Sequence, residues 1–175
     1  CKMSKTIHAI RHGQAQHNMD PPASWYNPEF KFSSLTPLGI EQACTAPKLE
    51  VDGIYVSPLR RTLQTAFYMF GSVPMIALPE LRETNLDHIV NTHEDRADLE
   101  AQYPHVDFSR VDITDVGRYR DDHQTKIDVL FTILRESPCE TIAIVSHYDL
   151  LMSVFERLEL EIETVKHVQP YTFRI

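Results

Sequence analysis

The sequence predicts an α/β fold with a mostly parallel central sheet. Short apolar runs rich in β-branched residues, at 6–10, 53–56 and 141–145, alternate with segments whose apolar residues recur at helical spacing. Such alternation is typical of parallel strands joined by right-handed crossovers. Each run also stops at polar or charged residues, as strands do when they end at a ligand-binding edge. At 175 residues the chain has the length of one domain, so we expect residues 1–175 to form a single domain.

Local signals place the first elements. Gly13, directly after the first strand, is expected to let the backbone turn sharply and approach a ligand. Thr36 is suited to cap a helix and Pro37 to occupy its first turn. The pair Ser57-Pro58 repeats this pattern after the second strand, so we expect another helix to start there.

The remaining elements follow in order. We expect a short strand at 74–78, a short helix at 95–102, a helix from about 118 to 135 capped by Thr114 or Asp115, the strand at 141–145, a helix opened by Asp149, and a last strand at 171–175. The stretches at about 18–34 and 85–115 are otherwise irregular, and we expect them to form pocket-side insertions.

Composition and charge narrow the range of partners. The net charge of -8 argues against nucleic-acid binding, although a local group of arginines and histidines still suits an anionic small molecule. No apolar run approaches the length of a membrane span, and no signal peptide is visible. The cysteines Cys1, Cys44 and Cys139 have no metal-ligand spacing, so we expect reduced thiols in a cytoplasmic protein. The sequence leaves the oligomeric state open.

Charged and basic side chains follow several of the expected strands. Arg11 and His12 follow the first strand, and Arg61 lies in the helix after the second. Glu83 follows the short third strand, and His147 follows the strand at 141–145. Because the carboxyl ends of parallel strands meet at one edge of a sheet, we expect these five side chains to converge there.

This combination of side chains suits phosphoryl transfer. The planar fork of each arginine matches phosphate oxygens, and a second histidine would help to spread the charge of the transition state. His12 would attack phosphorus in line and carry the phosphoryl group as a phosphohistidine. Glu83 would protonate the leaving oxygen and then activate water. Because side chains supply the positive charge, we expect a small phosphorylated substrate and neither a metal nor another cofactor.

Four segments resemble the motifs of one protein family. They are Arg11-His12-Gly13 with Asn18 five residues on, the run 57–66 (SPLRRTLQTA), Leu81-Arg82-Glu83, and Val145-Ser146-His147. In kind and in order they resemble the histidine phosphatase superfamily, the phosphoglycerate mutase-like proteins. Together they span nearly the whole chain.

The resemblance implies both a fold and a set of roles. The implied fold is a three-layer αβα sandwich, and the implied chemistry needs no metal. His12 would be the phosphorylated nucleophile and Glu83 the proton donor. The residues implied to bind the phosphoryl group are Arg11, Arg61, His147 and Asn18.

Two departures from the family pattern bear on the activity. The run 84–88 (TNLDH) lacks the Arg-His-Tyr-Gly-like sequence of sugar-phosphate mutases, which favours a phosphatase. After His147 the family often has two glycines, whereas Tyr148 and Asp149 stand here, so we expect a reshaped pocket floor with Tyr148 near the substrate. Asp149 would add negative charge near the site or cap the next helix.

Alternatives remain open at this stage: a phosphosugar mutase, or an inactive phosphate-binding regulatory module on the same fold. Aromatic residues in or near the insertions are candidates for an apolar region that suits an aromatic or lipophilic phosphate over a sugar phosphate: Trp25, Tyr26, Phe30, Phe32, Tyr103 and Phe108. Gln14 and His17 are expected at the pocket rim, with Gln14 a candidate for substrate binding, and Arg60 as a solvated neighbour of Arg61. The other histidines expected at the surface are His88, His93, His105, His123 and His167.

Overall fold

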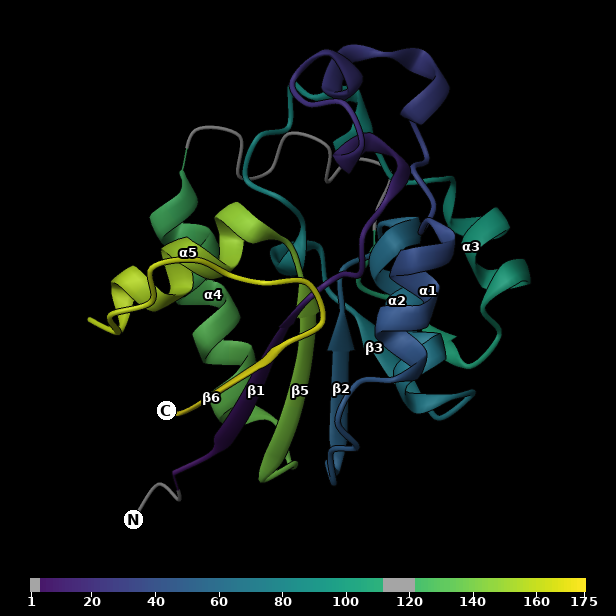
Figure 1. The fold of residues 1–175 in the computed structure, drawn as a ribbon. Helices are drawn as coiled ribbons and strands as arrows, with labels where there is room; N and C mark the ends of the chain where they lie inside the picture. The colour runs from purple at the N-terminus through teal and green to yellow at the C-terminus, as the bar shows by residue number, and fades with distance from the viewer. Residues whose placement is uncertain (1–3, 112–121) are drawn as a thin grey trace.

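A six-stranded central sheet runs through the residues that the structure describes, 4–111 and 122–175 of this computed structural model (Figure 1). The strands are β1 Thr6–Arg11, β2 Gly53–Val56, β3 Met75–Ala77, β4 Val106–Asp107, β5 Thr141–Ser146 and β6 Pro170–Arg174. Their order is β4-β3-β2-β5-β1-β6, with β6 antiparallel to β1 and all other neighbours parallel. The predicted mostly parallel α/β sheet is confirmed.

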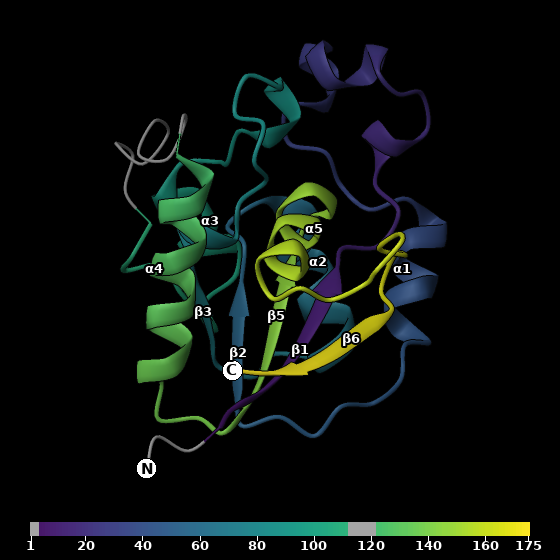
Figure 2. The same ribbon diagram turned by 90° about the vertical axis from the view of Figure 1, so that its left-hand side faces the viewer.

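Helices cover both faces of this sheet, as the sandwich architecture requires. They are α1 Pro37–Cys44, α2 Arg60–Phe70, α3 Arg96–Gln102, α4 His123–Glu136 and α5 Tyr148–Arg157. Helices α4 and α5 lie on one face and α1, α2 and α3 on the other (Figures 1 and 2). Side chains alternate along β5, so Ile144 joins Leu130 of α4 in one core while Val145 joins Leu63 of α2 in the other.

A side-chain cap fixes the start of α1, whereas α2 begins without one. Thr36 Oγ1 accepts a hydrogen bond from the backbone N–H of Gly39 at 3.1 Å, so α1 begins where predicted. The start predicted for α2 was wrong. We expected Pro58 in the first turn, but Leu59 is still extended and the helix begins at Arg60. The extended lead-in leaves the hydroxyl of Ser57 directed at His147, 2.8 Å away.

The starts of the last two helices also differ from expectation. Asp122 caps α4 by accepting a hydrogen bond from the N–H of Thr125 at 2.9 Å. The expected caps Thr114 and Asp115 lie outside the described residues. Helix α5 begins at Tyr148, one residue before Asp149.

The turn after β1 packs tightly against α1. A Cβ atom placed on Gly13 would lie 2.6 Å from the carbonyl oxygen of Gly39, a distance that a side chain does not tolerate. The close approach that Gly13 permits is therefore to the backbone of α1. Gln14 belongs to the same contact, since its Oε1 accepts a hydrogen bond from Thr36 Oγ1 at 2.8 Å.

The expected insertions are built from short 3₁₀ turns. Three of these turns, η1 Gln16–Asn18, η2 Ala23–Tyr26 and η3 Pro28–Phe30, follow β1, and η5 Ile89–Asn91 packs against η2 and η3. They lie above the carboxyl ends of the strands (Figures 1 and 2). Among the described residues, no helix has the length and apolarity needed to cross a membrane. Cys44 and Cys139 are free thiols.

Candidate active site

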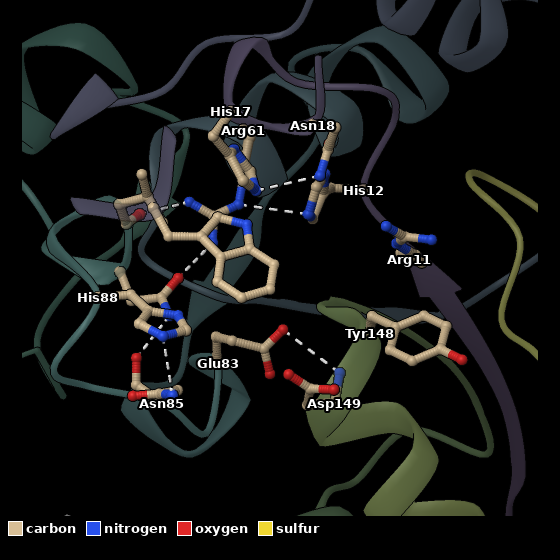
Figure 3. A pocket seen from close by; sticks show the side chains of 13 residues that line it. Arg11, His12, His17, Asn18, Arg61, Glu83, Asn85, His88, Tyr148 and Asp149 are labelled. Atoms are coloured by element: carbon tan, nitrogen blue, oxygen red, sulfur yellow. Dashed lines mark hydrogen bonds between the residues drawn. The ribbon is translucent and has the colours of Figure 1, made fainter. Parts of the chain in front are cut away.

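A cavity of about 420 Å³ opens at the carboxyl ends of the strands, beneath the 3₁₀ turns (Figure 3). Its lining residues are Arg11, His12, His17, Asn18, Trp25, Arg61, Glu83, Asn85, His88, Val90, Asn91, Tyr148 and Asp149. They come from the end of β1 and the turn after it, α2, the segment after β3, both insertions and the start of α5. The convergence expected from the strand ends is therefore present for Arg11, His12, Arg61 and Glu83.

The geometry around His12 fixes its tautomer. Its Nδ1 lies 2.7 Å from the carbonyl oxygen of Gly13, and because a carbonyl only accepts, Nδ1 carries the proton. The lone pair is then on Nε2, which accepts a hydrogen bond from Arg61 Nε at 3.3 Å. Burial, and then the charge of Arg61, hold the pKa of His12 well below its usual range. His12 is thus a neutral imidazole at the cavity, and its Nε2 lone pair accepts only the long hydrogen bond from Arg61.

Arg61 is held rigidly at the start of α2. Its Nη1 donates to the carbonyl of Val90 at 2.6 Å and its Nη2 to Asn91 Oδ1 at 2.8 Å. Asn91 is itself fixed, because its amide donates to the carbonyl of Asn85 at 2.6 Å. Burial lowers the pKa of Arg61 to about 10, so the guanidinium stays charged at neutral pH. A fixed positive charge therefore stands beside Nε2 of His12.

Arg11 brings a second positive charge into the cavity. Its Nη1 donates to the carbonyl of Val165 at 3.0 Å, and its guanidinium lies 5.0 Å from the centre of the Tyr148 ring. The buried Nε makes no hydrogen bond to the residues that the structure describes. This donor is the kind of group that an oxyanion in the cavity would satisfy.

His147 lies behind His12 rather than on the cavity wall. Its ring is fully buried, with its centre 5.3 Å from that of His12, and its Nε2 pairs with Ser57 Oγ at 2.8 Å. Its Nδ1 has no hydrogen-bond partner in the described ranges. Burial, followed by the charge of Arg61, lowers its pKa well below the usual value. The role implied for His147, contact with a phosphoryl group, stays a prediction that rests on this free ring nitrogen.

Glu83 lies at the N-terminus of α5. Its Oε1 accepts hydrogen bonds from the N–H groups of Thr84 at 2.9 Å and Leu150 at 3.0 Å, and its Oε2 from that of Asp149 at 3.3 Å. Burial, and then the neighbouring carboxylate of Asp149, raise the pKa of Glu83. A raised pKa keeps a proton on the carboxyl to higher pH, as a general acid requires.

Of the remaining residues predicted to bind substrate, Asn18 and Tyr148 line the cavity and Gln14 does not. Asn18 lines the cavity, where its amide donates to His17 Nε2 at 3.2 Å and its Oδ1 accepts from the N–H of Ala15 at 2.9 Å. Tyr148 also lines the cavity, in contact with Arg11. Gln14 does not, because its side chain is held by Thr36 outside it.

Sequence reasoning missed three histidines near His12 or in the cavity wall. His17, expected at the rim, is buried, and burial lowers its pKa to about 2. His88, expected at the surface, lines the cavity and stacks on Trp25 with ring centres 4.9 Å apart. His167, also expected at the surface, donates from Nδ1 to the carbonyl of His12 at 2.7 Å. No spacing signal marks the last two, because packed loops and the antiparallel β6 bring them to the site.

The expected aromatic region is only partly formed. Trp25 lines the cavity, and Tyr26 meets the edge of His88 at 5.0 Å between ring centres. The assignments of Phe108 and Tyr103 were wrong, because neither lines the cavity: Phe108 is buried in the core between the sheet and α2, and Tyr103 packs against that core. Arg60 was expected to be solvated, but it forms an ion pair with the buried carboxylate of Glu94.

Comparison with known proteins agrees with this site. Residues 7–172 match the histidine phosphatase superfamily (branch 1). The chain belongs to this superfamily. A phosphoglycerate mutase-like protein of Arabidopsis thaliana is 29% identical over 206 residues, which cover 93% of this chain and 70% of that protein.

Solved structures share the fold. The alpha-ribazole phosphatase from Shigella flexneri superposes with a TM-score of 0.64 at 21% identity, over 95% of this chain and 89% of that one. A phosphoserine phosphatase from Entamoeba histolytica, solved with phosphoserine, gives a TM-score of 0.61 at 20% identity, over 97% and 90%. The phosphoglycerate mutase-like architecture is thereby confirmed.

Proposed function

We propose that this histidine phosphatase hydrolyses a small-molecule phosphate monoester through a phosphohistidine on His12, without a metal. The observation that carries the proposal is the state of His12: a neutral imidazole with its proton on Nδ1 and its lone pair on Nε2 beside Arg61. A nucleophile of this kind needs no separate base, because burial and the adjacent guanidinium already keep it deprotonated.

The first half of the reaction transfers the phosphoryl group. Nε2 of His12 forms a bond to phosphorus while the bond from phosphorus to the leaving oxygen breaks, and Glu83 gives that oxygen its proton. Arg11 and Arg61 stabilise the charge on the phosphoryl oxygens during transfer. The Nδ1 proton stays on the ring and donates a hydrogen bond to the carbonyl of Gly13, which offsets the developing imidazolium charge.

The second half returns the enzyme to its starting state. Glu83, now ionised, takes a proton from a water molecule whose oxygen attacks phosphorus, and the bond to Nε2 breaks. Inorganic phosphate leaves, and both His12 and Glu83 recover their original protonation. The amides that hold the Glu83 carboxylate at the start of α5 keep it in place for both steps.

The test is phosphate release from phenyl phosphate in the presence of a chelator. We expect turnover by the native chain, a loss of at least about a thousand-fold for His12→Ala, and unchanged turnover for the control His105→Ala, which lies away from the cavity. An isomerised ester in place of free phosphate would instead identify a mutase. Tight vanadate binding without turnover would identify an inactive phosphate-binding module.

The cytoplasmic location expected from the cysteines stays a prediction.

A further inference from the structure

The wall of the cavity next to Glu83 carries an unneutralised carboxylate. Asp149 lines the cavity, and its own N–H donates to Glu83, but its carboxylate makes no hydrogen bond or ion pair within the described ranges. Figure 3 shows the Asp149 and Glu83 carboxyl groups side by side, across the cavity from His12. Because Glu83 protonates the leaving oxygen, this is the wall that the leaving group of a substrate must meet.

Two guanidiniums supply the positive charge of the described cavity lining, and Asp149 forms no ion pair with either. Burial lowers the pKa of Arg11, and the charge of Asp149 is among those that oppose this shift. Among the described lining residues, the arginines are Arg11 and Arg61, and Arg61 is committed to His12 and to the segment after β3. Burial lowers the pKa of both His12 and His17, so neither ring adds charge at neutral pH. A phosphoryl group uses the two guanidiniums, and a second anionic group on the substrate would face Asp149 instead.

Aromatic rings form the neighbouring wall. Trp25 and His88 both line the cavity and are nearly parallel, with an angle of 25° between their planes. His88 is also held by Asn85, whose amide lies 2.9 Å from His88 Nε2. Flat rings fixed in this way favour contact with a flat group over a highly hydrated sugar.

We propose that the cavity selects phosphate monoesters whose leaving group is a ring without negative charge, contacted by Trp25 and His88, and that Asp149 repels leaving groups with a second anion. The inference rests on the proposed phosphatase activity and names its substrate class. It disfavours phosphorylated carboxylic acids and bisphosphates, and it favours neutral or cationic ring esters, since a cation would pair with the free carboxylate.

Binding of three matched esters tests the charge preference. They are 4-(aminomethyl)phenyl, 4-(hydroxymethyl)phenyl and 4-(carboxymethyl)phenyl phosphate, which differ in charge while a methylene insulates the ring. Trp25 is the single tryptophan of the chain and lies in the cavity wall, so its fluorescence reports occupancy directly. Titrations use the full-length His12→Ala variant, which retains both arginines and cannot form the phosphohistidine.

We expect each step from cation to neutral to anion to weaken binding by about five-fold, as for two partly exposed unit charges a few ångströms apart. Adding Asp149→Asn should level this ranking, because the amide keeps the shape of the side chain without its charge. The control Glu156→Gln removes an exposed charge from the same helix and should leave the ranking intact. Equal affinities for the three esters, or a preference for the anionic one, would overturn the proposal.

A second comparison tests the ring contact. His88→Ala should weaken the neutral aryl ester by about five-fold and leave methyl phosphate unchanged, because only the aryl ester loses a stacking partner. Equal weakening of both would overturn the aromatic contact. Turnover of the same esters by the native chain distinguishes the phosphatase activity from the proposed substrate selectivity. If none is hydrolysed, the phosphatase proposal fails, whereas hydrolysis at equal kcat/KM removes only the selectivity.

Discussion

At the scale of single residues, neighbouring charges of both signs determine the pKa of Glu83. Burial and the carboxylate of Asp149 raise its pKa, while Arg61 lowers it and the buried ammonium of Lys126 also faces it. A carboxyl with a raised pKa stays protonated, and so remains a general acid, to a higher pH before it loses its proton. The activity that depends on this acid is therefore present below the Glu83 pKa and is lost as pH rises through it.

The pH profile of Asp149→Asn follows from this balance. Removing the like charge lowers the Glu83 pKa, so the alkaline limb of kcat/KM should move to lower pH for benzyl phosphate, whose alkoxide leaving group needs the proton. The acidic limb of the profile should keep its position, because burial and Arg61, not Asp149, hold the pKa of His12 well below its usual range. Glu156→Gln serves as the control that should not move the profile. An alkaline limb unmoved by Asp149→Asn would exclude this coupling.

His167 is a positioning residue, because it reaches the reaction only through the backbone of His12. The hydrogen bond from its Nδ1 to the His12 carbonyl fixes the turn that orients the nucleophile. His167→Leu should lower kcat by about ten-fold with little change in KM, since misplaced reacting groups reduce rate more than binding. His167→Asn offers a donor near the same position and should restore most of the rate. A leucine variant with native kcat would contradict this role.

At the scale of elements, two consecutive arginines at the start of α2 hold the second insertion. Arg61 bonds the backbone of Val90, and Arg60 forms a two-point ion pair with Glu94, which also accepts from Gln102 Nε2 at 3.0 Å. Phe32 of the first insertion lies 5.7 Å from the Arg60 guanidinium. Arg60 and Arg61 at the start of α2 therefore contact both insertions.

Removing the ion pair between Arg60 and Glu94 should weaken substrate binding. Arg60→Ala should raise KM for an aryl phosphate several-fold and lower kcat less, because the segment that carries His88 moves while Arg61 stays. The matched control is Arg96→Ala, which breaks an exposed ion pair with Glu100 within α3 and should change neither constant. Equal effects of the two variants on KM would show that Arg60 does not position the cavity wall.

The sequence predicted elements well where a local signal decides them. The apolar runs specified β2 and β5, and Thr36 specified the start of α1. Pro58 misled because a proline in the first turn of a helix and a proline just ahead of the helix look alike in sequence. His167 and His88 could not be found, because tertiary packing of β6 and of the insertions determines their contacts. Strand-end reasoning placed Arg11, His12, Arg61 and Glu83 together because each lies at or shortly after the carboxyl end of a parallel strand.

At the scale of the whole molecule, the two cores hold the strand ends in register. Leu130 of α4 is fully buried in the core that it shares with β5, whereas Leu160 is 38% exposed. Leu130→Ala should lower the free energy of unfolding by about 2–5 kcal/mol, and Leu160→Ala by far less. Urea unfolding measures both, and kcat per folded molecule should stay native. A Leu130→Ala protein with native stability would mean that this core does not support the sheet.

The central claim is that His12 carries the phosphoryl group on Nε2, and the most direct test is to trap the phosphoenzyme. The chain is mixed with phenyl phosphate, quenched in alkali within its first turnovers, and mapped by mass spectrometry and ³¹P NMR. We expect one phosphohistidine, at His12 and on Nε2, because Gly13 holds the Nδ1 proton. Phosphate on Nδ1, on His17 or His147, or turnover without any phosphohistidine would contradict the account.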